Sequence, residues 1–130
     1  AGALAYRLKL FDLGLVAFVP KGGAAHATYA MTRDTGTQRY LAPEALRGRD
    51  YNAAVDTYAF GLNAWEMLTL RKPYVNLDAT LHRAVVCPPT SQRPRLPAAW
   101  SSELRSVVAS CWAPEQRDRP PLADAEARLR

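Results

Sequence analysis

The residue types best suited to chemistry lie in the first third of the chain. Asp12 precedes Leu13 and Gly14, and an aspartate in front of such a glycine commonly forms a turn. Segment 20–37 is rich in Gly, Thr and Ala, lacks periodicity and carries hydroxyl groups at Thr28, Tyr29, Thr32, Thr35 and Thr37. Loops of this length inside a domain are usually functional or disordered. Taken alone, these residues indicate a turn-forming acid and a polar loop.

Thiols and imidazoles are few and scattered. Cys87 and Cys111 make no disulfide framework, and no Cys-x-x-Cys spacing indicates zinc. His26 and His82 each stand without a second histidine nearby, so we expect neither to bind a metal. Reduced, partly buried thiols in an intracellular protein are therefore predicted.

Hydrophobic periodicity predicts the elements that position these groups. The strongest helix covers 55–69 and is apolar on nearly every face, which is typical of a helix buried inside a domain, and Asn52 is its predicted N-cap. The other predicted elements are a short helix over 77–86, an irregular proline-rich connection over 87–97, a helix over 101–112 and a last helix from Pro121.

The N-terminal end is predicted to form a short β-hairpin. Residues 6–11 alternate apolar and polar side chains, 12–14 make a turn, and 15–19 supply a second strand. The expected fold class is therefore mainly α, with this hairpin at the N-terminus and about four to five helices.

Bulk composition bounds the possible functions. The chain has 130 residues, 48% of them hydrophobic, which suits one domain with a modest core. Its net charge of +5 comes mostly from scattered arginines that do not alternate with aromatic residues, so no nucleic-acid partner is predicted. No apolar run reaches the roughly 20 residues that span a bilayer, and the N-terminus does not match a signal peptide.

Four motifs in order resemble those of protein kinases. Residues 8–15 resemble the strand-turn-strand that carries Asp-Phe-Gly, with Leu13 in place of the usual Phe, and 36–44 resemble the end of an activation segment. Residues 56–68 are similar to the central buried helix. Residues 111–120 match the junction before the last helix of tyrosine-kinase-like kinases. Together they cover nearly the whole chain and identify it as similar to the C-terminal lobe of a tyrosine-kinase-like serine/threonine kinase, from the Asp-Phe-Gly region onward.

The resemblance divides residues 1–130 into three parts and implies a nucleotide site. Residues 1–19 would form the metal-binding strand-turn-strand, 20–44 the activation segment and 45–130 the helices. Asp12 would coordinate the Mg²⁺ that bridges the phosphates of ATP, because a hard cation takes carboxylate oxygens. Gly14 would let the backbone place or withdraw Asp12. Leu13 would still serve as the apolar regulatory plug.

Hydroxyl groups in segment 20–44 have implied regulatory and substrate roles. Phosphate on an activation loop can pair with arginine and order the segment, which makes Thr28, Thr32 and Thr35 candidate phosphosites. The threonine of Gly-Thr-x-x-Tyr, here Thr37, contacts the catalytic base region and shapes the substrate pocket in serine/threonine kinases. The resemblance therefore favours serine/threonine specificity.

Three charged residues have implied structural roles. Glu44 and Arg119 match the pair that ties the activation segment to the C-terminal helices through a buried ion pair. Asp56 would accept backbone N–H bonds from the catalytic loop, because a carboxylate within an apolar helix needs partners. The alternative for Asp56 is a first-turn acid that interacts favourably with the helix dipole.

Several kinase parts are absent from these 130 residues. The sequence contains no Gly-x-Gly-x-x-Gly, no Val-Ala-x-Lys strand and no His-Arg-Asp catalytic loop. We therefore expect the chain alone to be inactive, its central helix to be left partly uncovered, and a longer parent protein to act on ATP and protein substrates as a serine/threonine kinase. The alternatives are a pseudokinase-type binding or scaffold module and a basic interaction domain unrelated to kinases. The expected location is the cytoplasm, although the parent could be membrane-tethered elsewhere.

Overall fold

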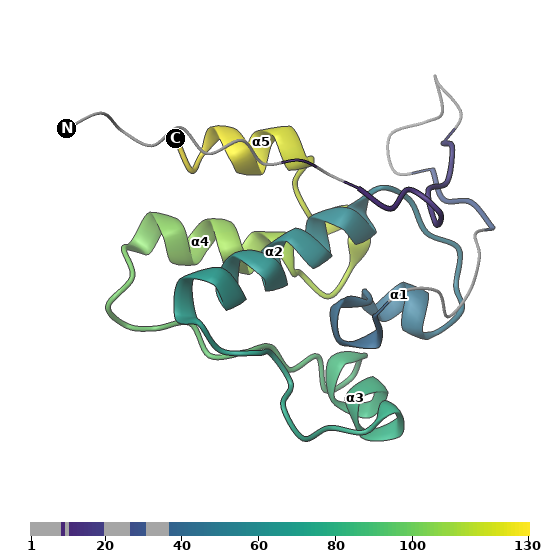
Figure 1. Ribbon diagram of the computed structural model, residues 1–130, viewed down its shortest axis with the longest axis horizontal. Helices are drawn as coiled ribbons and strands as arrows, with labels where there is room; N and C mark the ends of the chain where they lie inside the picture. The colour runs from purple at the N-terminus through teal and green to yellow at the C-terminus, as the bar shows by residue number, and fades with distance from the viewer. Residues whose placement is uncertain (1–8, 10, 20–26, 31–36) are drawn as a thin grey trace.

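The computed structural model describes residues 9, 11–19, 27–30 and 37–130. The described part of the chain is mainly helical, as predicted, with five α-helices. Their bounds, together with two 3-10 helices, are η1 Gln38–Tyr40, α1 Pro43–Leu46, α2 Ala54–Thr69, α3 Ala79–Val86, α4 Ser102–Cys111, η2 Gln116–Asp118 and α5 Leu122–Ala127. Helix α2 crosses the middle of the molecule beside α4, while α1 and α3 lie at one end (Figure 1).

Helix α2 is the scaffold of the fold. The N-cap of α2 is Ala53, one position after the predicted Asn52, and its side chain makes no cap hydrogen bond. Asn52 still contributes, because its Oδ1 accepts a hydrogen bond of 2.9 Å from the Ala54 N–H, one of the first free backbone donors. The side chains of Tyr58 and Leu62 are fully buried. Gly61 allows the close approach of α4, because a Cβ at this position would lie only 2.9 Å from the Cβ of Cys111. The apolar pattern of 55–69 thus correctly predicted a central helix.

The remaining predicted helices also form, each with a local reason for its start. Asp78 accepts from the Leu81 N–H at 2.8 Å and begins α3, and Ser101 Oγ accepts from the Leu104 N–H at 3.2 Å and begins α4. Pro121 is the N-cap of α5, one position before the place predicted for it. The four-residue helix α1, with Pro43 at its first turn, was not predicted.

The prediction that residues 15–19 form the second strand of a hairpin is wrong. Residues 15–19 belong to no strand, and the local pairing is a turn in which the Val16 N–H donates to the Leu13 carbonyl at 3.1 Å. A strand needs a ladder partner, and the predicted partner, 6–11, lies mostly outside the described residues. The division at residues 19 and 44 stays a prediction.

Candidate active site

The turn at Asp12 has an unusual backbone. Asp12 has φ of 61°, in the left-handed region that few non-glycine residues adopt, although aspartate tolerates it better than most. Its Oδ1 lies 3.5 Å from where a Cβ on Gly14 would sit, so the carboxyl group leans over the glycine. Sparsely populated backbone conformations cluster at functional sites. The backbone conformation at Asp12 therefore supports Asp12 as a candidate functional residue.

Asp12 faces a hollow that gathers residues from distant parts of the sequence. The hollow has a volume of about 540 Å³, and its lining includes Asp12, Thr37 and Asp56. Asn63, two helical turns after Asp56 along α2, lines it as well. Apolar side chains of the Asp12 turn and of α2 make up much of the rest. The structure thus places Asp12, Thr37 and Asp56, for which the sequence analysis predicted metal-binding, substrate-contact and structural roles, around one hollow. Gly14 lies in the turn beside it.

Asp56 lies in the first turn of α2, and its side chain is exposed on the hollow. Among the described residues, nothing donates a hydrogen bond to its carboxylate. Partial burial by the surrounding groups raises the pKa of Asp56 above its ordinary value of 3.8. The N–H partners that the resemblance implies for Asp56 are therefore not supplied by the part of the chain that the structure describes.

Thr37 is fixed by the segment that follows it. The Tyr40 N–H donates to the Thr37 carbonyl at 3.0 Å, which closes η1, and the Tyr40 hydroxyl donates to Glu66 Oε2 on α2 at 2.7 Å. Burial and the bond to Glu66 raise the pKa of Tyr40. Arg39 donates to the Pro73 carbonyl on the connection after α2. Residues 37–40 are therefore tied to both α2 and the segment beyond it.

Behind the hollow, Glu44 and Arg119 form a buried bidentate ion pair. Arg119 Nη1 and Nη2 lie 2.6 and 2.8 Å from the two carboxylate oxygens of Glu44. The Arg119 side chain is 0% exposed and that of Glu44 is 8% exposed. The pair joins α1 to the connection between η2 and α5.

Arg119 also satisfies its remaining donors. Its Nε donates to the Ala113 carbonyl at 2.9 Å, Nη1 to the Ala54 carbonyl at 3.1 Å, and Nη2 to the Pro114 carbonyl at 3.2 Å. All five guanidinium N–H groups therefore have partners. A buried charge is tolerated only when it is paired and hydrogen-bonded in this way.

The sequence analysis missed the aromatic support of this pair. The guanidinium carbon of Arg119 lies 5.0 Å from the ring centroid of Tyr58, and that of Arg93 lies 5.1 Å from the same centroid. Both distances suit cation–π attraction. Burial raises the pKa of Tyr58 far above its ordinary value. The apolar period predicted that Tyr58 is in the core, but no sequence signal linked it to Arg93, which lies in a proline-rich connection.

The candidate phosphosites are only partly described. Thr28 is exposed, next to the isolated bridge between Tyr29 and Tyr51. Thr32 and Thr35 lie outside the described residues. Within the described residues, no three His, Cys, Asp or Glu side chains gather as a metal site, and no helix has the length and hydropathy to cross a bilayer.

Comparison with known proteins decides the family. Residues 5–129 match the family model of protein tyrosine and serine/threonine kinases. The chain belongs to the protein kinase family. This kinase chain is 33% identical over 117 residues to a probable serine/threonine-protein kinase of Dictyostelium discoideum. The matched residues make up 90% of this chain and 12% of that protein.

Two further relatives come from a plant and a mammal. The serine/threonine-protein kinase VIK of Arabidopsis thaliana is 32% identical over 123 residues, covering 94% of this chain and 27% of that protein. Receptor-interacting serine/threonine-protein kinase 3 of Rattus norvegicus is 35% identical over 129 residues, covering 92% of this chain and 27% of that protein. The kinase chain thus spans well under half the length of these relatives.

The ion pair generates a stability prediction. Arg119→Ala removes one partner of a buried pair and should lower the free energy of unfolding by about 3–5 kcal/mol. Arg117→Ala is the matched control, because Arg117 is 74% exposed and lies 3.9 Å from Asp118, where a surface pair contributes at most about 1 kcal/mol. Thermal unfolding followed by circular dichroism compares the two variants. Equal melting temperatures would contradict the structural role of Arg119.

The raised pKa of Asp56 generates a second prediction. A carboxyl group whose pKa is higher folded than unfolded destabilises the fold at neutral pH, and this cost disappears as the pH falls below the unfolded value. Asp56→Asn should therefore raise the melting temperature at pH 7, and the gain should vanish towards about pH 4. Asp50→Asn, at an exposed position, is the control and should change little. A melting temperature lowered by Asp56→Asn at pH 7 would show that the charge stabilises the helix instead.

Proposed function

We propose that the longer protein containing this chain transfers the γ-phosphate of ATP to serine and threonine hydroxyls of proteins. The observation that carries the proposal is the convergence of Asp12, Thr37 and Asp56 on one hollow in a chain of the kinase family. Phosphoryl transfer depends mostly on positioning and charge neutralisation. The hollow has the Asp12 carboxylate and Thr37 in its lining. It could therefore hold a metal ion next to a bound substrate.

Asp12 is the proposed ligand of Mg²⁺. Its carboxylate is exposed on the hollow, and it supplies the hard oxygen donors that Mg²⁺ prefers. Mg²⁺ is commonly held by one or two carboxylates together with substrate phosphates, so a single acid at this place fits a shared site. When bound with ATP, the ion would neutralise charge on the phosphates. The left-handed backbone at Asp12 directs the carboxylate, and Gly14 leaves room beneath it.

Thr37 is the proposed contact to the substrate side of the site. The Thr37 carbonyl accepts the hydrogen bond that closes η1, and the Tyr40 hydroxyl binds Glu66 of α2. The backbone of Thr37 is therefore held in place beside the hollow. The relatives described above carry names of serine/threonine kinases, which supports serine/threonine specificity for the longer protein. Exposed Thr28 remains a candidate for regulatory phosphorylation.

The chain by itself is proposed to be inactive. Its sequence contains no glycine-rich nucleotide loop, no phosphate-pairing lysine motif and no His-Arg-Asp base. Asp56, exposed and without a described hydrogen-bond donor, is proposed to anchor the loop that carries the base. The pseudokinase-type scaffold remains the second candidate, because Leu13 replaces the usual phenylalanine.

An assay on two proteins tests the proposal. The 130-residue chain should transfer no labelled phosphate from ATP and Mg²⁺ to itself or to serine- and threonine-containing peptides. The full-length parent should do so, and Asp12→Asn in that parent should lower the rate by at least about a hundredfold, because metal positioning is lost. Asp50→Asn should leave the rate unchanged. Mg²⁺-dependent autophosphorylation by the isolated chain would overturn the claim of inactivity, and a parent that binds ATP without transfer would favour the scaffold.

A further inference from the structure

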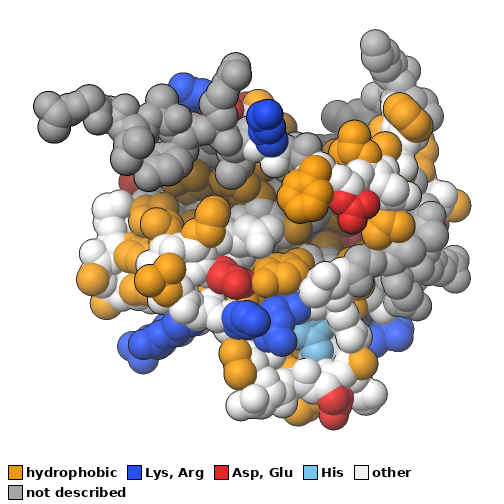
Figure 2. Space-filling model, viewed as in Figure 1, with side chains coloured by type: hydrophobic (Ala, Val, Ile, Leu, Met, Phe, Trp, Pro, Cys, Tyr) orange, Lys and Arg blue, Asp and Glu red, His pale blue; other side chains and the backbone are white. Residues whose placement is uncertain are grey.

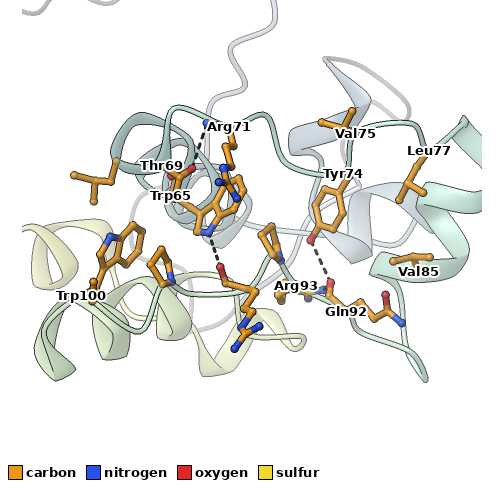
Figure 3. A pocket seen from close by; sticks show the side chains of 15 residues that line it. Trp65, Thr69, Arg71, Tyr74, Val75, Leu77, Val85, Gln92, Arg93 and Trp100 are labelled. Carbon is orange, nitrogen blue, oxygen red and sulfur yellow. Dashed lines mark hydrogen bonds between the residues drawn. The ribbon is translucent and has the colours of Figure 1, made fainter.

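A second cavity lies where α2 ends, away from the Asp12 hollow. Its volume is about 720 Å³, and none of its lining residues lines the hollow. The lining comes from the end of α2, the connection 71–77, the end of α3 and the proline-rich segment 92–100. Figure 3 shows Trp65 and Trp100 on one side of this groove and Tyr74 on the other.

The groove has a firm apolar wall. Trp65 is 8% exposed, and its Nε1 donates to the Arg95 carbonyl at 3.1 Å. The Tyr74 hydroxyl donates to the Gln92 carbonyl at 3.1 Å on the opposite side. Leu68 and Val75 line the groove and are 54% and 55% exposed, so apolar surface remains open there. Exposed apolar surface framed by fixed aromatic residues is typical of a binding site.

All the charged residues that line the groove are positively charged. Arg71, Arg93 and Arg95 line it, and no Asp or Glu does. None of the three forms an ion pair with a carboxylate among the described residues. Hydrophobic and basic side chains lie next to one another on the face drawn in Figure 2. Single-sign charge over an apolar surface attracts a partner of opposite charge.

Arg93 adds a donor with no assigned use. Its Nε donates to the Trp112 carbonyl at 2.8 Å and its Nη1 to the Val86 carbonyl at 3.0 Å, so the guanidinium group is held in place. Its Nη2 is buried and has no hydrogen-bond partner among the described residues. A buried N–H group without a partner is costly, and Arg93 is one of the residues that line the groove.

We propose that this groove docks an acidic segment of a partner protein, with a bulky apolar side chain of that segment seated on the exposed Leu68 and Val75, beside Trp100. Trp, Tyr and Arg are the residues enriched at energetically important positions of protein interfaces. The partner's carboxylates would face Arg71 and Arg95 at the rim. This binding needs no nucleotide and is independent of phosphoryl transfer.

A nucleic acid fits the groove less well. Base stacking needs open aromatic faces, whereas Trp65 is almost fully buried and much of the wall is aliphatic or proline. A fatty-acid anion shares the required chemistry of an apolar body and a carboxylate, but it offers one charge to three arginines. Several carboxylates on a peptide complement the groove better.

Direct binding to the 130-residue chain tests the proposal. The probe is a fluorescein-labelled peptide, Glu-Asp-Glu-Phe-Leu-Asp-Glu, followed by anisotropy and by quenching of tryptophan emission, without ATP. We expect binding that weakens as salt rises. The double variant Arg71→Glu/Arg95→Glu should weaken it by at least about tenfold. Arg49→Glu is the matched control, because Arg49 is exposed and lies outside the groove, and it should change the affinity by less than about twofold.

A second variant separates docking from folding. Val75→Glu places a negative charge on the apolar wall and should abolish binding while the melting temperature stays that of the unchanged chain. A peptide with Gly-Gly in place of Phe-Leu should bind more weakly than the original peptide. The proposal is overturned if the acidic peptide fails to bind, if the charge-reversed and control variants bind it equally, or if oligouridylate or oleate occupies the groove in preference to the peptide.

Discussion

The buried contact between Glu44 and Arg119 is the interaction on which the rest of the structure depends. It joins α1, the start of α2 and the segment 113–114 through five hydrogen bonds from one guanidinium group. Tyr58 of α2 lies against the same group. Because α1 directly follows the segment that holds Thr37, fixing Glu44 also fixes one wall of the Asp12 hollow.

The site and the groove use the two ends of α2 for different purposes. Asp56 in the first turn of α2 and Asn63 past its middle line the hollow together with Asp12 and Thr37. Near its C-terminal end, Trp65 and Leu68 face the groove. The Tyr40 hydroxyl donates to Glu66, which also lies in the C-terminal part of α2. One rigid helix therefore positions both surfaces, which is expected when functional groups must keep a constant geometry.

The sequence predicted those features that depend on local or periodic signals. The apolar pattern of 55–69 and the prolines of 87–97 each act within a few residues, and both the central helix and the irregular connection form. Helix α1 is only four residues long, which is too short for a period to emerge. The strand over 15–19 required a ladder partner, and its predicted partner, 6–11, lies mostly outside the described residues. The contact of Arg93 with Tyr58 and the groove at Trp65 depend on packing between distant segments, which no local pattern encodes.

The most direct measurement of the central claim is a double-mutant cycle on the pair. Urea unfolding of the chain, of Glu44→Gln, of Arg119→Met and of the double variant gives the coupling free energy between the two side chains. The buried bidentate geometry predicts a coupling near the upper end of measured values, about 2–3 kcal/mol. Additivity within about 0.5 kcal/mol would contradict the view that this pair holds the site together.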